Sequence, residues 1–115
     1  MSHKDRALDR LYALIESFRT ALPDMTLTHV KALMEIAEAG EMTVKDLTDR
    51  LGLPQSSTSR LTDVLAGYSN GGYGSAGLIS KVRDRKMTYL RLAPAGQALL
   101  DRAKRQMTDG ARSRT

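Results

Sequence analysis

The segment from Gln55 to Arg60 combines short hydroxyls with one long arginine on the outer face of a predicted helix. The candidate contacts on this face are Gln55, Ser56, Ser57, Ser59 and Arg60. Serine hydroxyls can bind phosphates or base edges, and an arginine can donate to both major-groove acceptors of guanine. The segment therefore predicts a helix that enters the major groove of double-stranded DNA. The alternative interpretation is an ordinary solvated helix surface.

A basic stretch follows at the predicted turn of a hairpin. Its candidate DNA contacts are Arg83, Arg85 and Lys86, and Asp84 is the one acidic residue between positions 80 and 91. Cationic side chains at a hairpin tip suit neighbouring phosphates or a narrow minor groove. The other interpretation is a strand edge that its charges protect from aggregation. The net charge of +5 agrees with a polyanionic partner but does not require one.

Two short helices are predicted to position the polar segment. Thr43, with Asp46 three residues later, resembles a capping box, and the helix that it begins ends at Gly52. Pro54 suits the first turn of the following helix, which carries the candidate contacts. A longer helix precedes this pair, from a cap at Thr26 or Thr28 up to Gly40, and its broad apolar face predicts a central place in the core.

The second half of the chain predicts a hairpin and a last helix. Five glycines from position 67 to position 77 predict a loop, interpreted as a tolerated insertion. If the loop is instead functional, Tyr68 and Tyr73 are its candidate contacts with DNA, a protein partner or an effector. Strands are expected at 78–82 and 88–92 around the turn 83–86, and Pro94 begins the final helix. Two helices joined at a glycine turn and followed by a basic hairpin have the plan of a winged helix-turn-helix.

The first helix carries an apolar seam at coiled-coil spacing and stops at Pro23. Its residues, 3, 4, 3 and 4 positions apart, are Leu8, Leu11, Ile15, Phe18 and Leu22. This seam predicts a partner helix from a second subunit, and packing onto the subunit's own core is the alternative. The predicted fold class is mainly α with a small β-hairpin (α+β). We expect one domain over 1–115, with dimerisation helices at 1–22 and 94–109 and a DNA-binding core at 26–92 whose wing covers about 78–92.

Four segments, in order, resemble the MarR family of bacterial transcriptional regulators. Residues 43–61 resemble its helix-turn-helix, and 77–79 resemble the start of its wing. Asp84-Arg85-Lys86 is similar to its wing-tip motif, and 92–100 resemble the stretch that opens its last helix. The resemblance implies a homodimer whose first and last helices interlock, with Leu99 among the dimer contacts. It also implies a pseudo-palindromic operator, a repressor role and a small-molecule effector, which the sequence does not identify.

The chain departs from that family pattern in three places. The loop before the wing is longer than usual, and the wing turn is shorter. The last helix is expected to be brief, which would leave less surface for dimerisation.

Several other functions are excluded or disfavoured by composition. The chain has no cysteine, and His3 and His29 lie far apart without carboxylate neighbours at ligand spacing, so no metal site and no cofactor are expected. Nothing pairs a nucleophile with a base, which argues against an enzyme. Neither a signal peptide nor a membrane span is expected, and a cytoplasmic location follows. Two alternatives remain open: a winged-helix protein-interaction module, and an accessory DNA-binding protein without an effector.

Overall fold

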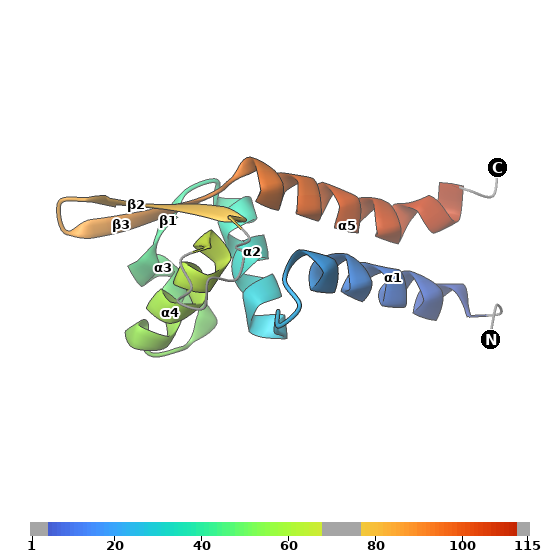
Figure 1. Ribbon diagram of the computed structural model, residues 1–115, viewed down its shortest axis with the longest axis horizontal. Helices are drawn as coiled ribbons and strands as arrows, with labels where there is room; N and C mark the ends of the chain where they lie inside the picture. The colour runs from blue at the N-terminus through green and yellow to red at the C-terminus, as the bar shows by residue number, and fades with distance from the viewer. Residues whose placement is uncertain (1–4, 68–76, 113–115) are drawn as a thin grey trace.

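The computed structural model describes residues 5–67 and 77–112. The predicted contact residues Tyr68 and Tyr73 lie outside these ranges. The described part is elongated, with extents of 52 × 29 × 25 Å. Helices α1 and α5 run side by side away from the other helices and the sheet, and the hairpin projects at the opposite end (Figure 1).

Helix α1 (Arg6–Ala21) and helix α2 (Leu27–Ala39) begin at side-chain caps. The predicted stop at Pro23 is confirmed, and Thr26 rather than Thr28 caps α2. The Thr26 N–H donates to Nδ1 of His29 at 3.0 Å, so a histidine occupies the position that a glutamate usually fills in a capping box. Burial lowers the pKa of His29, which favours the neutral ring that can accept this hydrogen bond.

The helix-turn-helix consists of α3 (Val44–Leu51) and α4 (Gln55–Ala66). The predicted capping box is confirmed, since the Asp46 N–H donates to the Thr43 hydroxyl and the Thr43 N–H to the Asp46 carboxylate. Gly52 ends α3 in the left-handed region at φ 69°, where a side chain would be strained. Pro54 stands one residue before α4 as its N-cap.

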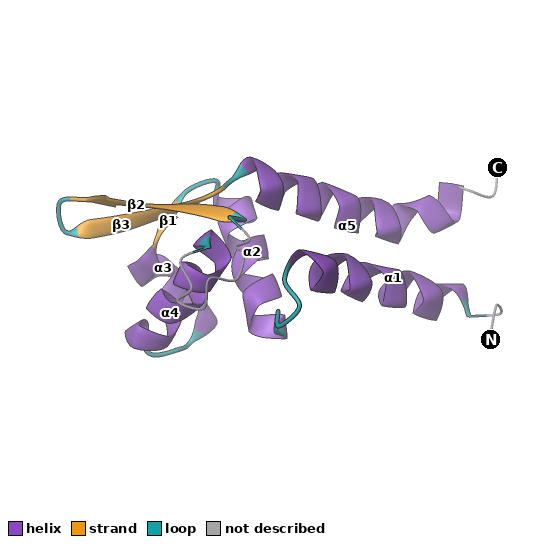
Figure 2. Ribbon diagram, viewed as in Figure 1, coloured by secondary structure: helices purple, strands orange, loops and turns teal. Residues whose placement is uncertain are grey.

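The sheet has three antiparallel strands, β1 (Met42–Thr43), β2 (Ile79–Asp84) and β3 (Met87–Leu92), in the order β1-β3-β2 (Figure 2). The predicted four-residue turn is wrong, because pairing continues to Asp84 and Met87 and leaves two turn residues. Arg85, the first of them, has a φ of 61°. Strand β1 was not expected, since two residues show no period and Thr43 already caps α3.

The core lies where α2, α3 and α4 meet β3 and the start of β2. Its fully buried large residues are Leu33, Ile36, Leu47, Leu65 and Leu90. Helix α5 (Pro94–Arg112) corrects the expectation of a brief last helix. Its apolar positions at Leu99, Leu100 and Ala103 are buried in the core cluster, and the helix continues past them along α1. Within the described ranges, no helix is long and apolar enough to cross a membrane.

Candidate nucleic-acid interface

Helix α4 turns its predicted polar face outward. Gln55, Ser56 and Arg60 are exposed, and Ser57 and Ser59 are partly exposed. The inward face differs slightly from the prediction: Thr62 is completely buried, and Leu61 only partly. Threonine was hard to assign from sequence because its hydroxyl needs a partner when buried, and here the Thr62 hydroxyl lies 3.0 Å from the Thr58 carbonyl oxygen.

The N-terminus of α4 adds backbone donors to this face. No side chain caps the helix, and within the described ranges no acceptor is found for the N–H groups of Gln55 and Ser56. The unpaired donors and the helix dipole together favour an anion such as a backbone phosphate. The same end of α4 therefore presents hydroxyls, backbone donors and the Gln55 amide.

The structure separates the basic stretch of the hairpin into two groups. Arg83, Arg85 and Lys86 are exposed around the turn, and Nε of Arg83 donates to the Arg85 carbonyl oxygen at 3.2 Å. Lys81 and Arg91 instead contact acids outside the hairpin. Lys81 Nζ lies 2.7 Å from Asp63 Oδ1, and Arg91 Nε lies 3.7 Å from Glu41 Oε1. The exposed positive charge around the turn of the hairpin therefore comes from the three predicted residues Arg83, Arg85 and Lys86.

The apolar seam of α1 is divided between two environments. Leu8, Leu11 and Ile15 are 56%, 49% and 46% exposed, together with Tyr12 at 67%. Phe18 and Leu99, in contrast, are buried in the subunit's own core, and Leu22 packs against it. Phe18, Leu22 and Leu99 thus have packing partners within the chain, whereas Leu8, Leu11 and Ile15 are largely exposed in it.

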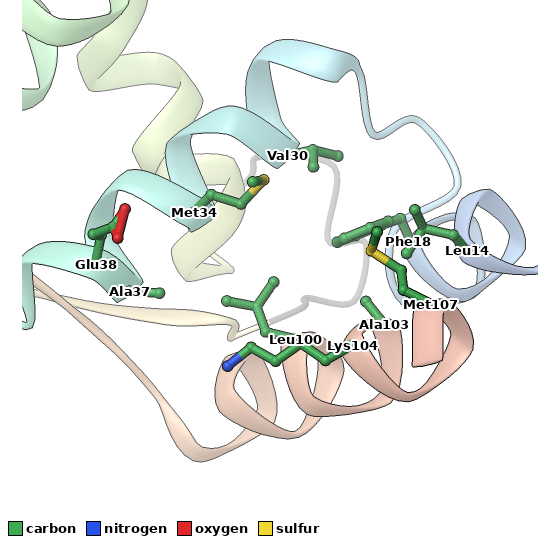
Figure 3. Close-up of a pocket in the computed structure, with 10 residues that line it drawn as sticks. All are labelled: Leu14, Phe18, Val30, Met34, Ala37, Glu38, Leu100, Ala103, Lys104 and Met107. Atoms are coloured by element: carbon green, nitrogen blue, oxygen red, sulfur yellow. The ribbon is translucent and has the colours of Figure 1, made fainter. Parts of the chain in front are cut away.

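A cavity of about 460 Å³ lies between α1, α2 and α5. Figure 3 shows Phe18 and Leu14 entering it from α1, Met34 from α2, and Leu100 and Met107 from α5. Glu38 and Lys104 are the charged residues of the lining. No effector residues were predicted from the sequence, because each of these positions has the pattern of an ordinary core or surface residue. The cavity forms only where the three helices pack together.

The two histidines of the chain do not form a metal site within the described residues. His3 lies outside the described ranges, and His29 caps α2. Within the part of the chain that the structure describes, no group of three or more His, Asp and Glu residues could hold a metal ion.

Comparison with known proteins relates this arrangement to one family. The model of the MarR family matches residues 24–67, the part that contains α2, β1, α3 and α4. The fold agrees along nearly the whole chain with the multiple antibiotic-resistance repressor MarR of Listeria monocytogenes (24% identity, TM-score 0.61, covering 94% of this chain and 70% of that one). The sequence is thus similar to the MarR family over residues 24–67, and the fold of the described residues is the fold of that Listeria protein.

Two other solved structures share the fold at lower sequence identity. RV1404 of Mycobacterium tuberculosis is 21% identical, with a TM-score of 0.69 over 94% of this chain and 69% of that one. NadR in complex with 4-hydroxyphenylacetate is 19% identical, with a TM-score of 0.61 over 98% of this chain and 78% of that one. No curated protein matches the sequence. The expected winged-helix fold is confirmed, with a three-stranded sheet in place of a lone hairpin.

Proposed function

We propose that this protein is a cytoplasmic, non-enzymatic transcriptional regulator of the MarR family that binds a pseudo-palindromic operator as a homodimer and represses transcription. The observation that carries the proposal is the pairing of an outward polar face on α4 with a cationic turn on the adjacent hairpin. Arg60 is exposed on that face and makes no ion pair with the residues described. Helix α4 would read bases in the major groove while the wing holds phosphates or the minor groove.

The two arginines have separate expected effects on DNA binding. An operator sequence is first obtained by selection from random duplexes with the wild-type protein, and binding is then measured by fluorescence anisotropy across a salt series. Arg60→Ala should weaken binding to the selected duplex about 10- to 100-fold and leave a scrambled duplex nearly unaffected, because a base contact is lost. Arg85→Ala should weaken binding to both duplexes. It should also reduce the slope of log affinity against log salt concentration by about 1 per wing.

Lys31→Ala serves as the matched control, since Lys31 is exposed on α2, outside α4 and the wing. It removes one positive charge and should leave the preference for the selected duplex intact. If the wild-type protein enriches no sequence and binds duplexes no better than a basic control protein, the regulator proposal fails. A protein-interaction module would then be the better interpretation.

We also propose that the cavity between α1, α2 and α5 holds a small effector with an apolar body. Its volume of about 460 Å³ falls in the usual range for ligand pockets, and its lining is mostly apolar. Lys104 could pair with an anionic group on the effector. The ligand in the NadR structure, 4-hydroxyphenylacetate, has this chemistry and is a suitable probe.

The effector proposal predicts ligand-dependent stabilisation that a cavity-filling substitution abolishes. At ten times its dissociation constant, 4-hydroxyphenylacetate should raise the melting temperature by about 5 °C, because it binds the folded state alone. Met34→Trp should remove the shift by filling the cavity. Leu27→Trp, at an 84% exposed site on the same helix, should retain it. Equal shifts in both variants, or no shift in the wild type, would contradict this site.

A further inference from the structure

Lys81 is the one cationic residue of the wing whose charge is directed into the protein. Its side chain is only 12% exposed, and Nζ is hydrogen-bonded to three acceptors on α4. These are the Ser59 carbonyl oxygen at 3.2 Å, the Thr62 hydroxyl at 2.9 Å and Oδ1 of Asp63 at 2.7 Å. An ammonium has three N–H donors, so the hydrogen-bonding capacity of Lys81 is used within the fold and none is left for a phosphate.

These contacts lie where the wing leaves the body of the protein. Toward the start of β2, the Leu78 N–H donates to the Leu65 carbonyl oxygen at 2.8 Å, which ties the strand to the end of α4. On the other edge of the sheet, the last β1–β3 pair is Thr43 with Tyr89. Beyond these anchors, from Val82 to the turn, β2 is exposed and pairs with β3 alone. Among the described residues, Lys81 thus makes the hydrogen bonds to α4 that lie farthest along the wing.

We propose that the Lys81–Asp63 pair is a positioning clamp that sets the angle between the wing and α4. This inference rests on the proposed DNA-binding function. Arg85 lies four positions beyond Lys81, a lever of about 13 Å, so a tilt of about 10° at the base displaces the tip by about 2 Å. Hydrogen bonds to phosphate tolerate less displacement than that. The clamp therefore aligns the wing cations with the phosphates next to the groove that α4 occupies.

Charge chemistry distinguishes this role from simple attraction to DNA. Lys81 gives up most of its hydration in this pair while Asp63 stays partly exposed, so the pair is a weak source of net stability, whereas its fixed geometry can select one arrangement of two elements. Asp63 belongs to the helix that faces DNA, and removing its negative charge should on electrostatic grounds strengthen binding. If the pair is a positioning clamp, removing the Asp63 carboxylate should instead weaken DNA binding.

The test compares Asp63→Ala with Asp49→Ala in the anisotropy assay, using the selected and scrambled duplexes. Both substitutions remove one acid from the helix-turn-helix and break one ion pair, but the Lys45–Asp49 pair lies within α3 and involves no wing residue. Asp49→Ala should bind the selected duplex as tightly as the wild type or more tightly. Asp63→Ala should bind it about tenfold more weakly and with a smaller salt slope, despite its higher net charge.

Two further readouts separate positioning from stability. Arg85→Ala should reduce affinity for the selected duplex fully in the wild-type background and less than twofold in the Asp63→Ala background. An unaligned wing makes few phosphate contacts, so removing Arg85 from it changes binding little. Without DNA, the amide order parameters of residues 83–87 should fall from about 0.85 toward 0.6 in Asp63→Ala. Lys81→Met should reproduce both results, and Asp63 is exposed enough (44%) that its alanine variant should remain folded.

The outcomes are distinguishable. Tenfold weaker binding by Asp63→Ala, a suppressed effect of Arg85→Ala and a more mobile wing would support the clamp. Unchanged or tighter binding by Asp63→Ala with an unchanged Arg85→Ala effect would overturn it while leaving the regulator proposal intact. Wild-type protein that selects no sequence would overturn the regulator proposal, and unchanged wing order parameters would overturn the clamp irrespective of DNA.

Discussion

The double substitution Leu11→Glu, Ile15→Glu is expected to convert the protein to a monomer and to weaken operator binding by about two to three orders of magnitude. Both side chains are about half exposed on α1, on the same face as Leu8 and Tyr12. Burying two carboxylates against an apolar partner would be strongly unfavourable. A monomer can occupy only one half-site, so it loses the gain in affinity that linked binding of the second half-site provides.

Light scattering and anisotropy together check this result. The mass should fall from twice the 12.6 kDa chain mass to that of one chain, and the selected duplex should be bound about as weakly as an isolated half-site. Leu27→Glu is the control, because Leu27 is an 84% exposed apolar residue outside α1. A wild-type protein that is already monomeric would contradict the proposed dimer, as would a double variant that remains dimeric.

Gly96→Ala is expected to destabilise the fold by about 2 kcal/mol or more, although alanine is the better helix former. Gly96 is buried in the first turn of α5, where a Cβ would overlap the Leu78 carbonyl oxygen and lie 3.2 Å from Cδ2 of Leu92. The Leu78 peptide cannot easily move, because its N–H donates to Leu65 and its carbonyl accepts from the Ala93 N–H at 2.9 Å. The cost of overpacking therefore exceeds the gain of about 1 kcal/mol in helix propensity.

Thermal unfolding at a fixed protein concentration should show a melting temperature about 8 °C lower or more for Gly96→Ala. The matched control is Ala95→Gly, which makes the reverse change at the neighbouring exposed position and should cost only about 0.5–1 kcal/mol. A Gly96→Ala variant as stable as the wild type would mean that α5 can move away from β2, and would remove the structural reason for a glycine at this position.

Local signals allowed much of the fold to be predicted from the sequence. The Thr43–Asp46 cap, the left-handed Gly52 and the stop at Pro23 each depend on residues within one turn of each other. The outward polar face of α4 follows from helical period alone. Each of these features is decided by the backbone and its nearest neighbours, so a linear pattern carries the information.

The paired and unpaired cations could not be separated in the same way. Lys81 and Arg83 are two residues apart in one basic stretch, yet Lys81 is bound by α4 whereas Arg83 is exposed. The contact with Asp63 spans 18 positions of the chain and depends on how β2 packs on α4. The sequence shows how many charges the stretch carries but not which of them are paired. The cavity could not be predicted for the same reason, because its lining residues come from three separate helices.

The amino-acid sequence by itself determined where the helices begin, the Thr43 cap, the presence of a hairpin and the polar outer face of α4, because these depend on periodicity and on short-range hydrogen bonds. Only the tertiary structure decided that Phe18, Leu22 and Leu99 are used within the subunit while Leu8, Leu11 and Ile15 are left exposed. An apolar seam specifies that a helix must be covered. Which side chains the chain itself covers depends on where the other elements end, and that is a property of the packed molecule.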